Sequence, residues 1–229
     1  MRKKVRSAAA CLMILAVALN GCTAKTAEAD GEKYPKRKIL LSTTVSEQSN
    51  ATVVGKLFAE EIEKATDGNI EVAVYSSDQL SGGNMSKGVE MLTQGAIDCA
   101  FEPVDVMAVL DNRMYALSLP WIFDSYEEAE ACLNGSGGEF ISKCLEKKDL
   151  KTLGFIHNGF RQLTNSKHPV TSPEDMKNLK LRVPGGDVFM KFFSELGADP
   201  VSMSFSELFT ALQQGTVDGQ ENPIASISS

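Results

Sequence analysis

The feature that most constrains the fold of this chain is a regular alternation of short apolar runs with longer stretches of helical periodicity. Residues 38–42 and 70–75 have the pattern of strands, and the apolar residues of 52–65 recur at helical spacing. The turn-forming sequence Asp67-Gly68-Asn69 separates this helix from the second strand. Strands that alternate with helices predict an α/β fold with a mainly parallel sheet and crossover helices.

The same alternation continues along the chain. Further strands are predicted at 97–101, 151–157 and 180–183, and further helices at 85–94, 126–133, 139–145, 188–196 and 208–214. Gly95, Gly197 and Gly215 are placed to end helices, because glycine readily adopts the left-handed conformation that follows a helix. The glycine-rich segment 135–138 is expected to separate two of the helices.

Two segments carry the sequence signature of a helix start. Ser204-Phe205-Ser206-Glu207 is a capping box, in which a serine and a glutamate three residues later satisfy each other's backbone donors. Ser172-Pro173-Glu174-Asp175 places a cap, a proline at the first helical position and acids in the first turn. Both segments therefore predict a helix immediately after the serine.

The charge of the chain excludes one class of partner. The net charge is −7, and the first 21 residues carry four basic side chains and no acidic one, so the remainder carries −11. A body this acidic repels phosphates, which excludes a nucleic-acid partner. The acidic part also lacks a polybasic stretch for anionic lipids.

The N-terminus has the pattern of an export signal. A basic segment, Arg2 to Arg6, precedes an apolar run over 8–19 that is too short to span a bilayer. The run ends in Leu19-Asn20-Gly21-Cys22, which resembles a lipobox, so residues 1–21 are predicted to be a signal peptide and Cys22 a diacylated N-terminus. An ordinary cleavage site with an incidental cysteine is the alternative. Residues 22–37 then form a polar tether.

The remaining cysteines and the histidines give no metal-site spacing. Cys99, Cys132 and Cys144 are an odd number with no CxxC pattern, and His157 and His168 are the only histidines. A disulfide between Cys132 and Cys144 is one alternative, and buried free thiols are favoured. No metal ion and no cofactor is expected.

From Gly159 onward the sequence resembles a known family. The matching text is GFRQLTNSKHPVTSPEDMKNLKLRVPGG, followed by LGADPVSMSFSELFTALQQGTVDGQENP. Weaker agreement reaches back through ALSLPWIF, the FEP segment at Phe101 and YSSDQLSGG to about residue 38. In their order and spacing these motifs are similar to the solute-binding subunit of TRAP (tripartite ATP-independent periplasmic) transporters, the DctP-like family.

The resemblance implies a periplasmic-binding-protein-like fold, in which two α/β lobes surround a ligand cleft. The first lobe is expected over 38–158 and part of the second over 159–229, which carries the ligand-binding motifs. The function implied is capture of a carboxylate-bearing organic acid, such as a C4-dicarboxylate or a sugar acid. The resemblance further implies that the captured acid is delivered to TRAP permease subunits in the membrane. The protein would act outside the cell membrane or in the periplasm, held by its lipid anchor.

The resemblance also suggests which residues bind the ligand. Arg182, in LRVP, matches the arginine that pairs with the ligand carboxylate, and a guanidinium is suited to this because its planar donors match a carboxylate. Arg161 matches a second arginine near the ligand, and Asn222 an amide that contacts it. A surface ion pair is the plain alternative for Arg182, and a helix cap before Pro223 is the plain alternative for Asn222.

Two further residues are weaker candidates. Phe205 is suggested as an apolar wall of the cleft, with core packing as the alternative. Glu102 matches a position that contacts hydroxyl or amino groups of some ligands, or it orients the arginines. The sequence departs from the family after LRVP, where Gly185 and Gly186 replace a polar side chain that often reaches the solute. The backbone N–H groups of these glycines are candidate anion donors.

Family members continue well beyond QENP, whereas this sequence ends at Ser229. The C-terminal part of the fold is therefore expected to be missing, and the chain by itself is expected to be a poor binder, a non-functional fragment of such a protein. A secreted hydrolase is the alternative of a different class. The sequence lacks GxSxG, HExxH and any phosphate-binding glycine pattern, so no enzymatic activity is predicted.

Cys22 gives the first testable prediction. Expressed in a bacterial envelope, the protein should partition into the membrane fraction, and its mature N-terminus should carry acyl mass. Cys22→Ser should release it from the membrane, whereas Cys99→Ser should not. A soluble mature form of the unaltered protein, with no acyl mass in the mass spectrum, would refute the lipidation of Cys22.

Overall fold

A computed structural model of the chain describes residues 34–228, so the predicted signal peptide, Cys22 and most of the predicted tether lie outside the described residues. The strands are β1 (Arg37–Thr43), β2 (Ile70–Tyr75), β3 (Cys99–Phe101), β4 (Arg161–Asn165), β5 (Lys180–Val183), β6 (Asp199–Ser202) and β7 (Gly219–Pro223). The α-helices are α1 (Asn50–Ala65), α2 (Met85–Thr93), α3 (Val104–Met107), α4 (Tyr126–Leu133), α5 (Ser136–Glu146), α6 (Asp187–Glu195), α7 (Phe205–Gln213) and α8 (Ile224–Ile227). Three 3-10 turns complete the fold: η1 (Gln79–Ser81), η2 (Asn112–Ser118) and η3 (Pro173–Met176).

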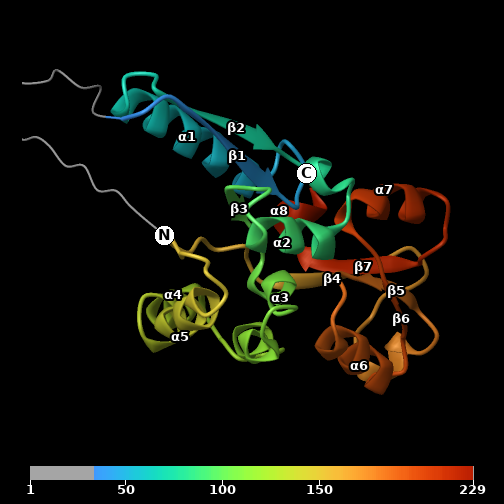
Figure 1. The fold of residues 1–229 in the computed structure, drawn as a ribbon. Coiled ribbons are helices and arrows are strands. Elements are labelled where there is room, and N and C mark those ends of the chain that lie inside the picture. The colour runs from blue at the N-terminus through green and yellow to red at the C-terminus, as the bar shows by residue number, and fades with distance from the viewer. Residues whose placement is uncertain (1–33, 229) are drawn as a thin grey trace, which may run out of the picture. The chain divides into compact units, whose positions relative to one another are not determined.

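The strands form two sheets within one compact unit, Tyr34–Ser229 (Figure 1). The first sheet has the order β2-β1-β3, and all of its pairs are parallel. The second has the order β4-β7-β5-β6, in which β5 is parallel to both neighbours and β4 is antiparallel to β7. The predicted α/β class with mainly parallel sheets is confirmed. The first sheet draws only on residues before 158 and the second only on residues after 159, while the division into two lobes stays a prediction.

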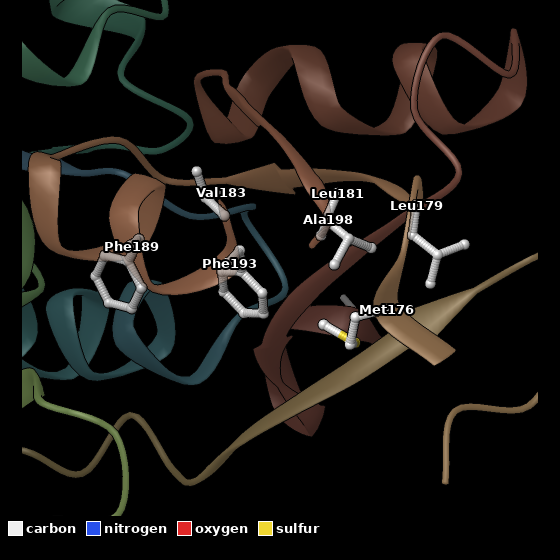
Figure 2. Close-up of a cluster of buried hydrophobic side chains, with 7 residues drawn as sticks. All are labelled: Met176, Leu179, Leu181, Val183, Phe189, Phe193 and Ala198. Carbon is white, nitrogen blue, oxygen red and sulfur yellow. The ribbon is translucent and has the colours of Figure 1, made fainter. Parts of the chain in front are cut away.

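Each sheet has its own apolar core. Leu41 and Val72 from the first sheet pack with Ala59 of α1, which lies alongside β1 and β2 in Figure 1. The core of the second sheet contains Leu181, Val183, Phe189, Phe193, Met176, Leu179 and Ala198, and Figure 2 shows these side chains gathered between β5 and α6. Phe189 and Phe193 of α6 both face this core because residues four positions apart lie on the same side of a helix.

A third core joins the helices that follow β3. Its buried members are Val89, Met107, Ala108, Met114, Ile141 and Cys144. Tyr115 of η2 packs against this core and also against the core of the second sheet. Tyr115 is therefore a side chain shared by two parts of the described chain. No helix within residues 34–228 is both long enough and apolar enough to cross a membrane.

The strand predicted at 151–157 is wrong, because the structure has no regular element between residues 151 and 160. A strand needs a neighbouring strand to accept and donate its backbone hydrogen bonds, and neither sheet offers one to this segment. Its apolar side chains also lack cover, since Leu153 is 76% exposed and Ile156 is 46% exposed.

The predicted start of the helix at 139 is also wrong, because α5 begins at Ser136 and includes Gly137 and Gly138. A Cβ at Gly138 would lie 1.9 Å from the carbonyl oxygen of Leu133, and one at Gly137 would lie 2.4 Å from the sulfur of Cys132. The glycines therefore let α5 start directly against the end of α4. They are part of the helix and not a spacer before it.

Cys99, Cys132 and Cys144 are all free thiols, so the alternative of a disulfide between Cys132 and Cys144 is not realised. Only Cys144 is buried, whereas Cys99 and Cys132 are half-buried. The preference for free thiols is confirmed, and their full burial is confirmed for Cys144 alone.

Gly186 lies where the shared side chain of Tyr115 meets α6. Its backbone has φ +85° and ψ 145°, a conformation that residues with a side chain rarely adopt. A Cβ at this position would lie 1.9 Å from the Oη and 2.8 Å from the Cζ of Tyr115. The phenol of Tyr115 thus occupies the space in which a side chain at position 186 would stand.

Gly186→Ala should lower the free energy of unfolding by about 3 kcal/mol, because it adds backbone strain to a steric clash. Gly154→Ala is the matched control, since Gly154 has ordinary backbone and no atom within 4 Å of the added Cβ. It should change stability by less than about 1 kcal/mol. Urea unfolding followed by circular dichroism measures both, and equal stabilities of the two variants would contradict the clash.

A group of buried polar residues lies beyond the carboxyl end of β1. Thr43 and Thr52 share a hydrogen bond of 2.7 Å between their hydroxyls. Asp78 is fully buried, and neither of its carboxylate oxygens has a partner within the described residues. Burial raises the pKa of Asp78 to about 6. The folded protein therefore holds the proton of Asp78 more tightly than the unfolded chain does.

This shift predicts a pH-dependent effect of Asp78→Asn. Because the folded state holds this proton more tightly, the protonated carboxyl stabilises the folded protein. This contribution is complete below about pH 4 and is lost as the pH rises through about 6. Asparagine does not ionise, so the stability of the variant relative to the original protein should increase from pH 4.5 to pH 7.5. Asp124→Asn, at an exposed aspartate, should show no such trend. Unfolding free energies at the two pH values test this, and a constant difference for Asp78→Asn would rule it out.

Candidate functional site

One small cavity collects residues from both halves of the described chain. Its volume is about 30 Å³, which is room for one or two water molecules. The lining residues are Thr44, Val45, Met85, Pro103, Asp105, Val106, Asn158, Arg161, Arg182, Pro184, Phe205, Asn222 and Ser226. Four of the five residues predicted to bind ligand, namely Arg161, Arg182, Phe205 and Asn222, are thus brought together, although they span 62 positions of sequence.

Arg182 lies on β5, between strands β6 and β7 in the second sheet. It is only 1% exposed, so the alternative of a surface arginine is wrong. Its Nε donates to the carbonyl oxygen of Met203 at 2.9 Å, and its guanidinium carbon is 6.0 Å from the ring centre of Phe205. Burial, with a smaller contribution from neighbouring Arg161, lowers the pKa of Arg182 to about 10. The side chain therefore stays positively charged at neutral pH.

Arg161, at the start of β4, is held by the neighbouring strand β7. Its guanidinium makes a two-pronged ion pair with Glu221, in which Nε donates to Oε2 and Nη2 donates to Oε1 at 2.8 Å. Nη2 also donates to the carbonyl oxygen of Glu221 at 2.9 Å. The guanidinium carbon is 5.4 Å from the ring centre of Phe189. Glu221 is 95% buried as a side chain and fixes where Arg161 points.

Sequence reasoning missed Glu221, even though it lies inside the QENP motif. Ion pairing with Arg161 links positions 60 residues apart, and no local spacing signals such a contact. The only available signal was the position of the acid beside Asn222, within a motif already associated with ligand binding.

Asn222 is buried in β7 and takes part in the same network. Its Oδ1 accepts from Nη2 of Arg161 at 3.3 Å, and its Nδ2 donates to Oε1 of Gln220 at 2.7 Å. The alternative of a helix cap is wrong, because α8 begins after Pro223 and has no side-chain cap. The amide is therefore committed to the wall of the cavity.

Glu102 follows β3 and does not line the cavity itself. The hydroxyl of Thr44, a lining residue, donates to Oε2 of Glu102. Burial raises the pKa of Glu102 to about 8, and the charges of Asp78 and Asp105 add to the shift. No hydrogen bond joins Glu102 to either arginine within residues 34–228, and it is Glu221 that orients Arg161. The role of Glu102 toward a ligand stays a prediction.

Phe205 is the first residue of α7, and the predicted capping box of Ser204 and Glu207 starts this helix. The helix start places the half-buried Phe205 ring against the guanidinium of Arg182. Gly185 and Gly186, the candidate anion donors, do not line the cavity, and Tyr115 covers Gly186. The chain thus contributes aromatic and charged side chains to the cavity, but no glycine loop.

A larger hollow of about 550 Å³ runs along residues 163–170, but it is open and formed by a single stretch of chain. It contains neither of the buried arginines. Within the described part of the chain, no group of three or more His, Cys, Asp or Glu side chains is placed to hold a metal ion. The cavity around Arg182 is therefore the candidate site.

Known proteins resemble this chain in sequence and in fold. The chain is 31% identical over 188 residues to the C4-dicarboxylate-binding protein DctB of Bacillus subtilis, covering 82% of this chain and 53% of that protein. A TRAP periplasmic solute binding protein from Polaromonas sp. JS666, solved with bound D-erythronate, is 34% identical with a TM-score of 0.79. That comparison covers 84% of this chain and 63% of the other.

The sugar acid binding protein DctPAm from Advenella mimigardefordensis, solved in complex with galactonate, is 33% identical with a TM-score of 0.80, covering 85% of this chain and 62% of that one. The fold is thus that of periplasmic solute-binding proteins. The chain spans between 32% and 63% of the length of the curated relatives that it matches. Residues 41–229 match the family described as bacterial extracellular solute-binding protein, family 7, and the chain belongs to this DctP family.

Proposed function

We propose that this chain is the ligand-binding part of a TRAP solute-binding protein, which captures a small organic acid outside the cytoplasm and delivers it to a TRAP permease. The observation that carries the proposal is the state of Arg182. This arginine is almost completely buried, stays charged, and donates its one hydrogen bond within the described residues to a backbone carbonyl. A buried charge without an anionic partner is costly, and a ligand carboxylate would supply that partner.

The surroundings of Arg182 support a binding role. Arg161 is already neutralised by Glu221, so the positive charge left for a solute is that of Arg182. Neither His157 nor His168 lines the cavity, and no cysteine does. The cavity lining has carboxylate, amide and guanidinium groups, and the guanidinium suits recognition of a carboxylate.

The size of the cavity bears on how a solute enters. A volume of about 30 Å³ is far below the several hundred Å³ of ordinary small-molecule sites. The lining residues come from the neighbourhood of both sheets, so the cavity enlarges when the sheets move apart. This opening is the reverse of the hinge closure by which two-lobed binding proteins enclose a ligand after it has entered.

Arg182→Ala should weaken binding of a carboxylate solute by at least 30-fold, which corresponds to about 2–5 kcal/mol for breaking a buried charged contact. Arg182→Lys should also weaken binding, because lysine keeps the charge but loses the planar pair of donors. Lys180→Ala, an exposed residue on the same strand, is the control and should bind normally. Titration calorimetry of the full chain with D-galactonate and D-erythronate measures all three. Binding by Arg182→Ala within twofold of the original protein would refute the assignment.

A further inference from the structure

Asp105 is an acid in the cavity that the ligand-binding motifs do not contain. It lies in the first turn of α3, directly after the Glu102-Pro103 segment that follows β3. It lines the same cavity as Arg182 and Asn222. Its charge is close enough to raise the pKa of buried Glu221 and to oppose the lowering of the pKa of Arg182. Asp105 therefore faces the solute space together with the proposed carboxylate anchor.

Within residues 34–228, no hydrogen bond or ion pair reaches the carboxylate of Asp105. This separates it from Glu221, whose carboxylate is fully engaged by Arg161. Asp105 differs in the same way from Asp111, Asp175 and Asp218, which each accept hydrogen bonds from nearby groups. Asp105 is thus an acceptor whose hydrogen-bonding capacity is left for whatever occupies the cavity.

The cavity consequently has two chemically different sides. Residues from the neighbourhood of the first sheet contribute the carboxylate of Asp105 and the hydroxyl of Thr44, behind which lies Glu102. Residues from the second sheet contribute Arg182 and Asn222. A solute bound in the enlarged cavity should therefore offer an anionic group to Arg182 and a hydrogen-bond donor to Asp105.

From this arrangement we infer that the solute carries one carboxylate, which pairs with Arg182, and a hydroxyl or ammonium donor that bonds to Asp105, so that dicarboxylates are rejected. The inference rests on the proposed function, since it assumes that Arg182 holds a carboxylate. It follows because a second carboxylate would be brought against the unpaired charge of Asp105, and repulsion between like charges is strong in a site that excludes water. A hydroxyl or an ammonium group instead gives Asp105 the donor that the protein does not provide.

Three pairs of acids test the inference, each differing only at the end away from the shared carboxylate. D-Erythronate ends in a hydroxymethyl group where meso-tartrate has a second carboxylate. D-Galactonate and galactarate differ in the same way but have a longer carbon chain. 4-Aminobutyrate ends in an aminomethyl group, which is protonated at neutral pH, where succinate has a second carboxylate. Titration calorimetry of the full chain should show the monocarboxylate of at least one pair binding ten or more times more tightly than its dicarboxylate. The hydroxyl pairs and the ammonium pair distinguish the two kinds of donor.

The variant Asp105→Asn removes the charge while keeping the shape of the side chain. It should reduce the preference within that pair to threefold or less, mainly by improving the binding of the dicarboxylate. Asp124→Asn, at an exposed aspartate outside the cavity, makes the same change of charge and should leave the preference unchanged.

The outcomes separate this inference from the proposed function. Equal binding within every pair, abolished by Arg182→Ala, would overturn the inference and leave the proposed function standing. A preference that persists unchanged in Asp105→Asn would also overturn it, because another residue would then be the discriminating one. If neither this chain nor a version extended by the C-terminal segment of a relative binds any of the six acids, the proposed function fails and the inference fails with it.

Discussion

A guanidinium that leaves water must recover its lost hydration inside the protein, and the second sheet is organised around this requirement. Arg161 meets it with Glu221, on the adjacent strand, through a two-pronged ion pair. Arg182 meets it only in part, through one backbone carbonyl and the face of Phe205. The two arginines that line one cavity thus differ in how fully their charge is compensated, and the proposed role of Arg182 as an anion anchor rests on this difference.

The same requirement explains the unusual composition of β7. All five residues of this strand are buried, yet they are Gly, Gln, Glu, Asn and Pro. Glu221 and Asn222 are kept there by their contacts with Arg161, and a Cβ at Gly219 would lie 2.0 Å from the carbonyl oxygen of Thr164 on β4. A polar network thus takes the place of apolar packing in β7. Such a network stabilises the fold only while every member has a hydrogen-bond partner.

This composition is also why the sequence could not predict β7. Apolar periodicity locates an element by its buried face, and it located β2, β5 and α4 at their observed bounds. Apolar periodicity fails where the buried residues of a strand are polar, as in β7. It also fails where a strand is short and rich in turn-forming residues, as in β6 with Asp199 and Pro200. It also fails in the opposite direction at 151–157, where an apolar pattern is present but no partner strand is. The members of the site were accessible only through motif resemblance, and the free acceptor at Asp105 only through the three-dimensional arrangement.

A cavity of only about 30 Å³ would also affect how fast a solute is captured, apart from how tightly it is held. In the proposed binding role, a solute would reach Arg182 only once the cavity has enlarged, so uptake would proceed through an open population of the protein. The observed association rate should then stop rising at high solute concentration and level off at the rate of opening. Motions of this kind typically take about microseconds to milliseconds. The hydrogen bond from Ser206 on α7 to the carbonyl oxygen of Gly83 joins two segments far apart in the sequence, and a contact of this kind, if it resists opening, would act on the speed of capture.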